Sequence, residues 1–418
     1  MRILHITPSI QHPTMRGADR HYHFIRELSR RHSITLLSLT REPMTRAAAD
    51  ELSQYTERIL TFATHGAAKT TASDRLKRLL GRRVQNELSV RQAASRMRRA
   101  FDTLVRSEPF DVVLFHGKHL LSVIDDTRGL PLVIDFCDAT SMRIGTTMRF
   151  AKLTRLPLLT ARYLQVKGIE KRLLKRSPHR AFISARDRDA VLGRSSGAMV
   201  VANGVDRSYW HRQRGSRPRD HCIIFTGVMD YAPNEDAALL LIEKIVPLMR
   251  RAIPDLEVVI AGRDPSMRLQ ERARNVPGVQ VTGFVEDMRP YLERAAVFVA
   301  PLRFAAGMQN KVLEAMAMQM PVVATPVVAD GLRTGSEDAP VRVADDILEF
   351  AEATVHLLKH SAQRDAVAMQ ARRFVEKHFS WKNSARLLEQ MCLAAAGQAE
   401  PAFERQATAV EASRDRAA

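Results

Sequence analysis

A lysine and a glutamate stand one helical turn apart in the segment GMQNKVLEAMAMQMPVVAT, which runs from Gly307 to Thr325. The segment reads as a glycine turn, then a helix made almost entirely of Met, Ala, Val and Leu, then a strand that begins with proline. Because this helix is apolar on nearly every side, we expect it to be buried. Lys311 and Glu314 would then lie in the interior, where an unpaired charge is unfavourable, so we expect a bound group to complete them.

The positions of these two residues indicate what that group is. Backbone N–H groups at the start of a helix, together with the positive end of the helix dipole, attract anions such as phosphate. Lys311 adds a positive charge in the first turn, and Glu314 lies about 5 Å further along the axis. Its carboxylate can accept hydrogen bonds from a sugar diol such as ribose. The alternative is an ordinary Lys–Glu pair, three residues apart, on a partly exposed helix.

Three earlier loops carry similar signals. Gly227 follows a strand in IIFTGVMDYAPNEDA, where PNEDA reads as a helix start with Asn234 as its cap, although a plain strand-to-helix turn fits equally well. In VIAGRDPS, Arg263 stands at a strand end where it could face phosphate. In VTGFVEDMRPYL, Phe284 and Val285 could hold a nucleobase through backbone contacts.

Short β-rich runs alternate with helical stretches along the whole chain. Most of these runs are continuous Val, Ile and Leu, as in parallel strands covered by helices on both faces, so we expect two doubly wound α/β domains. Ligands of such sheets bind outside the carboxyl ends of the strands. The helical stretches are Ala18–Arg31, Asp74–Arg106 and Arg162–Arg176 in the first half. The expected strands are Arg2–Thr7, Ser33–Leu39, Asp111–Phe115, Leu132–Phe136, Arg180–Ser184, Met199–Ala202, Ile223–Thr226, Leu256–Ala261, Val279–Thr282, Val297–Pro301, Val322–Thr325 and Val341–Val343.

Composition narrows the class of protein. The 418 residues carry a net charge of +18, which predicts an acidic partner such as nucleic acid, an anionic membrane surface or a phosphorylated ligand, unless the charge is only a solvated face. The three cysteines, Cys137, Cys222 and Cys392, lie far apart without a CxxC motif, so we expect a reducing cytosol and no structural zinc. No run of 18 apolar residues occurs, and the first residues lack the apolar core of a signal peptide. No GxGxxG follows an early strand, which makes an oxidoreductase unlikely on sequence grounds.

The ordered motifs GFVED, APLR, GMQNKVLEAMA and PVVAT resemble the C-terminal domain of family 4 retaining glycosyltransferases, over roughly Cys222–Phe379. The resemblance implies the GT-B fold, in which two Rossmann-like domains face a central cleft. It also implies that a nucleotide diphosphate sugar binds the C-terminal domain. The donor-binding residues would be Gly227, Arg263, Phe284, Val285, Gly307, Met308, Gln309, Asn310, Lys311 and Glu314.

The same resemblance assigns roles in the first half. Gly17, Ala18, Asp19 and Arg20 stand where the family has a glycine-rich loop near the transferred sugar, and they are the expected acceptor contacts. The alternative is a capped helix start with surface charges. His116, at the end of a buried strand in FDVVLFHGKHL, matches a family histidine that contacts the donor sugar.

A carboxylate beyond a strand end could deprotonate the acceptor. Asp138 in LPLVIDFCDATS is the candidate, and loop capping is its alternative role.

The resemblance also sets the expected domains. Residues 1–205 form the acceptor domain, 206–221 a linker, 222–379 the nucleotide-sugar domain, 380–397 a helix that returns to the first domain, and 398–418 a disordered tail. The segments NGVD (Asn203–Asp206) and HFSWKNSARLLEQM (His378–Met391) match the family at this junction and closing helix.

One position departs from the family pattern, because Ala306 replaces the first Glu of Glu-x7-Glu. The amino-acid sequences of the two glycine loops resemble those of a family branch linked to bacterial exopolysaccharide loci, which includes exosortase-associated sugar transferases.

We therefore expect a retaining hexosyltransferase that needs neither a cofactor nor a metal, since the helix dipole, Lys311 and arginines can meet the phosphate charge. The acceptor would be a saccharide or a lipid-linked molecule. The protein would be cytoplasmic, with peripheral association at the inner face of an anionic cytoplasmic membrane. A nucleotide-sugar epimerase of the same fold is the alternative, and a basic nucleic-acid-binding protein is a weaker one because the basic runs lack interleaved aromatic residues.

Overall fold

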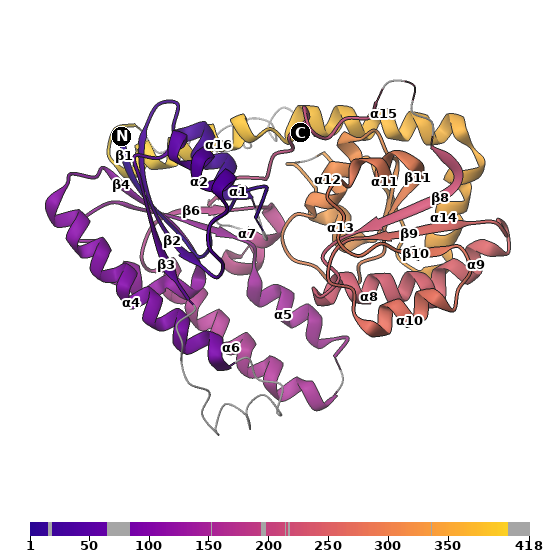
Figure 1. Cartoon of the computed structure of the whole chain (residues 1–418), viewed down its shortest axis with the longest axis horizontal. Coiled ribbons are helices and arrows are strands. Elements are labelled where there is room, and N and C mark those ends of the chain that lie inside the picture. The colour runs from indigo at the N-terminus through magenta and orange to yellow at the C-terminus, as the bar shows by residue number, and fades with distance from the viewer. Residues whose placement is uncertain are drawn as a thin grey trace, which may run out of the picture.

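The structure is a computed structural model, and it describes residues 1–15, 19–64, 84–151, 153–193, 198–213, 215, 218–335 and 337–399, with only the backbone for residues 84–88. Two α/β domains lie side by side, each built on a parallel sheet (Figure 1). The expected doubly wound architecture is confirmed. None of the described helices is long and apolar enough to cross a bilayer.

The N-terminal sheet has the strand order β3-β2-β1-β4-β5-β6-β7, with every pair parallel. Alternate residues of β1 face opposite layers: Leu4 packs with the cluster that contains Phe101 of α4, and Ile3 packs with Phe24 of α1. The strands are β1 (Arg2–Thr7), β2 (Ser33–Thr40), β3 (Arg58–Ala63), β4 (Val112–His116), β5 (Leu132–Cys137), β6 (His179–Phe182) and β7 (Met199–Val200). The helices are α1 (Arg20–Leu28), α2 (Arg46–Tyr55), α4 (Val84–Ser107), α5 (Thr140–Met148), α6 (Leu156–Leu174) and α7 (Ala185–Leu192), with short 3₁₀ helices at Lys118–Ile124 and Leu153–Arg155.

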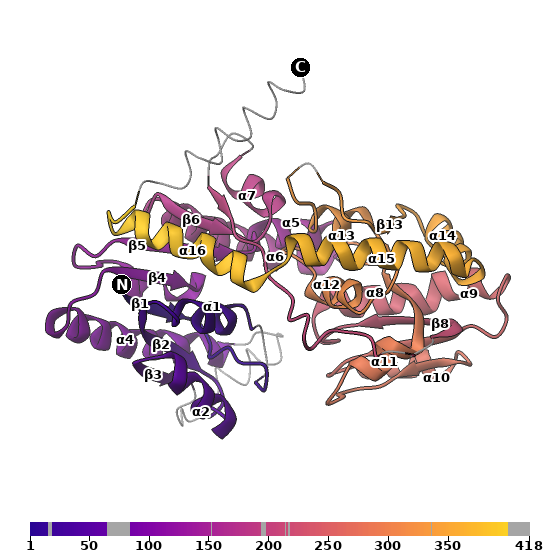
Figure 2. The ribbon, with the colours of Figure 1, turned by 90° about the horizontal axis from the view of Figure 1, so that it is seen from above.

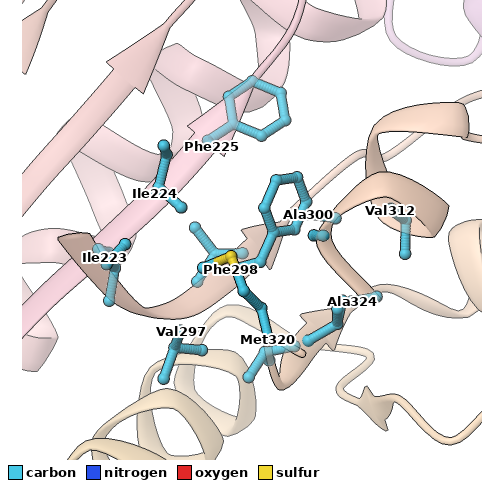
Figure 3. Packing of buried hydrophobic residues seen from close by; sticks show 14 of the residues in the cluster. Ile223, Ile224, Phe225, Val297, Phe298, Ala300, Val312, Met320 and Ala324 are labelled. Carbon is cyan, nitrogen blue, oxygen red and sulfur yellow. The ribbon is translucent and has the colours of Figure 1, made fainter. Parts of the chain in front are cut away.

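The C-terminal sheet has the order β10-β9-β8-β11-β12-β13, again parallel throughout. Its central strands are continuous apolar runs, and Figure 3 shows Phe298 packed among neighbours from β8, β11 and β12. The strands are β8 (Arg219–Thr226), β9 (Glu257–Ala261), β10 (Val279–Val281), β11 (Ala295–Ala300), β12 (Val322–Ala324) and β13 (Arg342–Val343). The helices are α8 (Ala232–Leu240), α9 (Val246–Arg250), α10 (Met267–Arg274), α11 (Arg289–Arg294), α12 (Asn310–Ala317), α13 (Pro326–Asp330), α14 (Ile347–Lys359), α15 (Ser361–His378) and α16 (Trp381–Ala395).

Each of the expected strands coincides with an observed one, but some elements were not anticipated. The edge strand β3 and the helices α2 and α5 were not predicted. β8 begins at Arg219, inside the segment assigned to the linker, and α6 begins at Leu156 rather than Arg162. The first part of the expected helix Asp74–Arg106 and residues 400–418 of the tail lie outside the described residues.

The last two helices run along one side of the molecule, α15 over the C-terminal domain and α16 over the N-terminal domain (Figure 2). Trp381, the first residue of α16, stacks on His23 with ring centroids 4.2 Å apart and meets Phe24 edge-on at 5.7 Å. At the other end of α16, the buried Glu389 accepts hydrogen bonds of 2.6 Å from Arg31 and His32. α16 therefore ties the end of the described chain to α1.

Gly204 allows this docking, because a Cβ atom at that position would lie 2.2 Å from the backbone nitrogen of Trp381. Gly204→Ala should therefore lower the free energy of unfolding by about 1–3 kcal/mol or more through overpacking. Gly168→Ala is the matched control, since no atom lies within 4 Å of its added methyl group and alanine favours α6. Chemical denaturation measures both, and equal stability of the two variants would contradict the packing.

Candidate active site

Lys311 lies at the carboxyl ends of β8 and β9 within a close-fitting polar cradle. Its ammonium donates a hydrogen bond to the side-chain oxygen of Asn234 and lies 4.6 Å from the centroid of the Phe225 ring. Asn234 in turn donates to the carbonyl of Val228 at 2.9 Å. Asn234 is thus a buried residue inside α8, whose N-cap position is Tyr231, so its predicted role as the cap is wrong.

Two glycines make room for this cradle. A Cβ atom on Gly227 would lie 2.6 Å from the side-chain nitrogen of Asn234 and 3.1 Å from the ammonium of Lys311. A Cβ atom on Gly262 would lie 1.8 Å from the carbonyl oxygen of Gly227. The loops after β8 and β9 therefore approach as closely as backbones can, which places their strand ends beside the first turn of α12.

Glu314 is partly buried and has no hydrogen-bond or ion-pair partner among the residues that the structure describes. Within the described part of the chain, its carboxyl group takes part in no hydrogen bond and has no cationic nitrogen within 4.0 Å, so the ordinary Lys–Glu pair is not formed. Burial raises the pKa of Glu314 to about 8, the charge of Asp19 from the other domain adds to the rise, and Lys311 opposes it. Burial likewise lowers the pKa of Lys311 to about 7, which Glu314 partly offsets.

The loop before α12 is fastened to the N-terminal domain. Asp187, fully buried at the start of α7, accepts hydrogen bonds from the backbone N–H of Gly307 at 3.0 Å and from that of Ala139 at 2.8 Å. Arg186 donates to the carbonyl of Gly307 at 2.9 Å and to the carbonyl of Val327. Sequence reasoning missed this clasp, although the Ser-x-x-Asp spacing of Ser184 and Asp187 is a capping signature.

The remaining residues of that loop are arranged along the start of α12. Gln309 occupies the N-cap position without a side-chain capping bond, and its amide donates to the carbonyl of Ala306 at 3.3 Å. The side chain of Asn310 accepts a hydrogen bond of 2.7 Å from Asn203 of the N-terminal domain, and Met308 is buried. Asp187 already binds the N–H of Gly307, which lies before the helix. The N–H groups that an anion could contact are therefore those in the first turn of α12.

His116 belongs to a group of neutral histidines in the N-terminal domain. Its Nδ1–H donates to the carbonyl of Asp135 at 3.0 Å, which leaves Nε2 with the lone pair. The His21 ring lies 4.3 Å away, and His21 Nδ1 is 3.0 Å from His5 Nε2. Burial lowers the pKa of His116, and it lowers the pKa of His21 to about 3 with help from His116.

Arg20, an expected acceptor contact, is buried within the N-terminal domain. Its guanidinium donates to both oxygens of Asp135, at 2.8 and 3.3 Å, and to Asn203 and the carbonyl of Val201. Burial alone would raise the pKa of Asp135, but Arg20 and His21 hold it well below its usual range. His21, His116 and Asp135 offer ligand atoms within 4.8 Å of one another, yet Arg20 already supplies a cation there.

The other expected acceptor residues lie near the domain boundary or outside the described chain. Asp19 is close enough to Glu314 to raise its pKa, and it lies 3.3 Å from His23. Gly17 and Ala18 lie outside the described residues.

Asp138 lies between the two domains. Its carboxylate accepts a hydrogen bond of 2.9 Å from Thr140 and has the Lys118 ammonium at 3.4 Å. A Cβ atom on Gly307 would lie 3.4 Å from the Cβ atom of Asp138, so Asp138 borders the loop before α12. Burial would raise the pKa of Asp138, but Lys118 and Arg143 lower it, which makes the carboxylate a weak proton acceptor.

The loop expected to face phosphate, with Arg263, lies at the end of β9, and the loop expected to hold the base, with Phe284 and Val285, lies at the end of β10. Arg263 pairs with Asp264 at 3.0 Å, and its carbonyl accepts from the N–H of Met229 at 2.9 Å. A bridge between Gly262 and Gly283 joins the two loops, after which Phe284 is 72% exposed and Val285 partly buried.

Sequence reasoning missed Tyr209, which stands in the expected linker. Arg289 lies over the Tyr209 ring at 4.2 Å, and the phenol donates a long hydrogen bond of 3.5 Å to Asp287. Burial and Asp287 raise the pKa of Tyr209, and Glu314 is close enough to add to the rise.

Comparison with known proteins agrees with this geometry. Residues 220–360 match the family model described as glycosyl transferases group 1. An uncharacterized 44.6 kDa protein in the cps region of Klebsiella pneumoniae is 22% identical over 38% of this chain and 43% of its own. A phosphatidyl-myo-inositol mannosyltransferase of Propionibacterium freudenreichii subsp. shermanii is 32% identical over 30% of this chain and 32% of its own. The chain thus spans less than half the length of these curated relatives.

Solved structures match over both domains. HepE of Anabaena, in complex with UDP and glucose, has a TM-score of 0.61 at 12% identity, over 93% of this chain and 98% of its own. Sucrose-phosphate synthase of Thermosynechococcus elongatus has a TM-score of 0.69 at 15% identity, over 94% and 98%. The fold is therefore the GT-B fold of glycosyltransferases, and residues 220–360 carry the likeness to the group 1 glycosyltransferase domain.

The geometry gives Arg20 a structural role that a stability measurement can test. Arg20→Ala leaves the carboxylate of Asp135 buried without its cation, so the free energy of unfolding should fall by about 3–5 kcal/mol. Adding Asp135→Asn removes the buried charge and should restore part of the loss. Full stability of Arg20→Ala in chemical denaturation would contradict this role and favour the acceptor contact.

Proposed function

We propose that this chain is a glycosyltransferase that transfers a sugar from a nucleotide diphosphate sugar to a saccharide or lipid-linked acceptor, in cell-surface or exopolysaccharide biosynthesis. The observation that carries the proposal is the Lys311–Glu314 pair, whose charged groups are enclosed but not joined to each other. The group 1 match over residues 220–360 and the nucleotide bound by HepE support a nucleotide-sugar donor. The cps-region relative supports a role in surface polysaccharides.

The donor diphosphate would lie against the first turn of α12. Lys311 would exchange part of its interaction with Asn234 for the phosphate oxygens, and the dipole of α12 would add positive potential. Charge that develops on the leaving diphosphate is stabilised by these fixed groups in a site shielded from water. Glu314, which has no partner in the described part of the chain, would accept hydrogen bonds from the ribose hydroxyls.

The sugar would face His116 across the domain boundary. Its Nε2 is the free acceptor atom, since Nδ1–H is used by the Asp135 carbonyl, and a neutral imidazole can accept a hydroxyl of the donor sugar. The Asp187 clasp holds the loop before α12 against the N-terminal domain, which helps to exclude water and so limits donor hydrolysis. Asp138 would position the acceptor rather than take its proton, because its pKa is lowered.

The finer features of the proposal follow from the family resemblance. Transfer would proceed with retention by attack on the same face of the sugar, without a metal. The protein would be cytoplasmic, peripheral to the inner membrane face. A nucleotide-sugar epimerase of this fold is distinguished by supplying donor without acceptor: an epimer would overturn the proposal, whereas slow hydrolysis agrees with it.

Donor binding should depend on the two residues of α12. Lys311→Met should weaken UDP-sugar binding about ten- to hundredfold, since it removes a hydrogen bond from a charged group, and Glu314→Gln should weaken it less. Thermal-shift titration with UDP-, GDP-, ADP- and CMP-sugars measures the affinity and identifies the base. Lys244→Met, on the exposed face of the same domain, is the control. Unchanged affinity in Lys311→Met would exclude the phosphate role.

His116→Ala should depress turnover more than donor affinity. The histidine is expected to contact the reacting sugar rather than the nucleotide, so kcat should fall by about 100-fold or more while the donor dissociation constant changes little. Steady-state kinetics and binding on the same preparation separate the two effects, with the exposed His211→Ala as control. A variant that loses affinity and keeps kcat would place His116 at the nucleotide instead.

A further inference from the structure

A row of side-chain hydrogen bonds crosses from the N-terminal sheet to the first residue of α12. Arg20, which pairs with Asp135 on β5, donates to the side-chain oxygen of Asn203 at 2.6 Å. Asn203 donates in turn to the side-chain oxygen of Asn310 at 2.7 Å. Because Arg20 is 2% exposed and Asn203 5%, water competes little for these bonds, and each is stronger than it would be at the surface.

The direction of this row is fixed by the chemistry of its first member. A guanidinium has N–H donors and no acceptor, so the amide of Asn203 must turn its oxygen toward Arg20. The NH2 group of Asn203 then faces Asn310, which must present its own oxygen. The NH2 group of Asn310 remains, and it forms no hydrogen bond within the described part of the chain. Every bond of the row therefore donates toward α12, and each polarises the next.

We propose that Asn310 donates its NH2 group to an oxygen of the donor diphosphate, and that Asn203 is the positioning residue that holds the Asn310 amide in this orientation. The inference rests on the proposed function and deepens it, because it adds a side-chain contact for the diphosphate besides Lys311. The buried charge of Arg20 strengthens that contact through the two amides that separate it from the ligand.

Asn310 stands where a contact to the diphosphate is expected. It is the first residue of α12, directly before Lys311, and its side chain is partly exposed. Residues four apart share one face of a helix, so Asn310 lies on the same side of α12 as Glu314 and about one turn nearer the N-terminus. Glu314 is the expected ribose contact. A diphosphate attached to that ribose would extend toward the helix start, where Asn310 lies.

The alternative is that the row only holds the two domains together. Arg186 and Asp187 already fasten the loop before α12 to the N-terminal domain through backbone atoms of Gly307. A second fastening would need no fixed direction, since two amides can bond in either orientation. The direction that Arg20 imposes decides what the free side of Asn310 offers, and it offers a donor, which suits a phosphate oxygen.

Calorimetric titration of the full chain with a nucleoside diphosphate, and with the nucleoside that lacks the phosphates, tests the inference. UDP, GDP, ADP and CDP are titrated into the wild type, and the one that binds is used with its nucleoside. Asn310→Ala should weaken diphosphate binding about tenfold, because it removes a hydrogen bond to a charged group, and should leave nucleoside binding unchanged. Asn203→Ala should weaken it about threefold, because the Asn310 amide can then turn either way. Asn383→Ala, exposed on α16, is the matched control and should bind as the wild type.

The double variant separates positioning from direct contact. If Asn203 acts through Asn310, the double alanine variant should bind the diphosphate as weakly as Asn310→Ala alone. Losses that multiply in the double variant, wild-type diphosphate affinity in either single variant, or a nucleoside affinity that falls as far as the diphosphate affinity would each overturn the inference. Because Asn310 is partly exposed, Asn310→Ala keeps the inference open to refutation even if Asn203→Ala does not fold.

Sugar transfer, assayed on the same preparations, keeps this inference apart from the proposed function. A wild type that binds the diphosphate but transfers no sugar would contradict the proposed function and leave the Asn310 contact standing. A wild type that transfers sugar, beside variants that bind the diphosphate normally, would contradict the inference alone. A wild type that binds none of the four nucleoside diphosphates would overturn both.

Discussion

The candidate site centres on a lysine and a glutamate that lie one turn apart on α12 without pairing with each other. Lys311 and Glu314 leave α12 in neighbouring directions, and among the described residues Lys311 contacts the amide oxygen of Asn234 and the face of the Phe225 ring. After burial, the charge of the Asp19 carboxylate is the next cause of the raised pKa of Glu314. A partly buried acid that has no partner among the described residues is unfavourable, which is why we propose a ligand that brings negative charge to the lysine and hydroxyl donors to the glutamate.

The rest of the molecule positions that helix turn. Gly227 and Gly262 let two loops approach until no side chain would fit between them, and Asp187 fastens the loop before α12 to the opposite domain. The histidine group and Arg20 form a polar network at the N-terminal sheet, in which Arg20 pairs with Asp135. In the proposed function, the donor would lie between this network and the first turn of α12.

The sequence predicted the elements well where the physical signal is local. Continuous apolar runs such as Val297–Pro301 are typical of interior parallel strands, whereas the edge strand β3, with its partly exposed residues, gave no such signal. Lys311 and Glu314 were found because both lie on one short helix. Asn234, Asp187 and Tyr209 act through partners that lie far away in the chain. Arg20 was assigned to the acceptor from the family resemblance, and its pairing with Asp135, more than one hundred residues away, gives no local signal in the sequence. Spacing along a chain does not encode such contacts.

The most direct measurement is the uptake of protons when a UDP-sugar binds. Its diphosphate has no group that titrates near neutrality, so a change in protonation reports on the protein. Because burial lowers the pKa of Lys311 to about 7, a bound diphosphate should return the lysine to its charged form. In a Glu314→Gln background, calorimetry at a pH above 7 in buffers of different ionisation enthalpy should show net proton uptake that Lys311→Met abolishes. Binding without proton uptake, or uptake that survives Lys311→Met, would contradict the account.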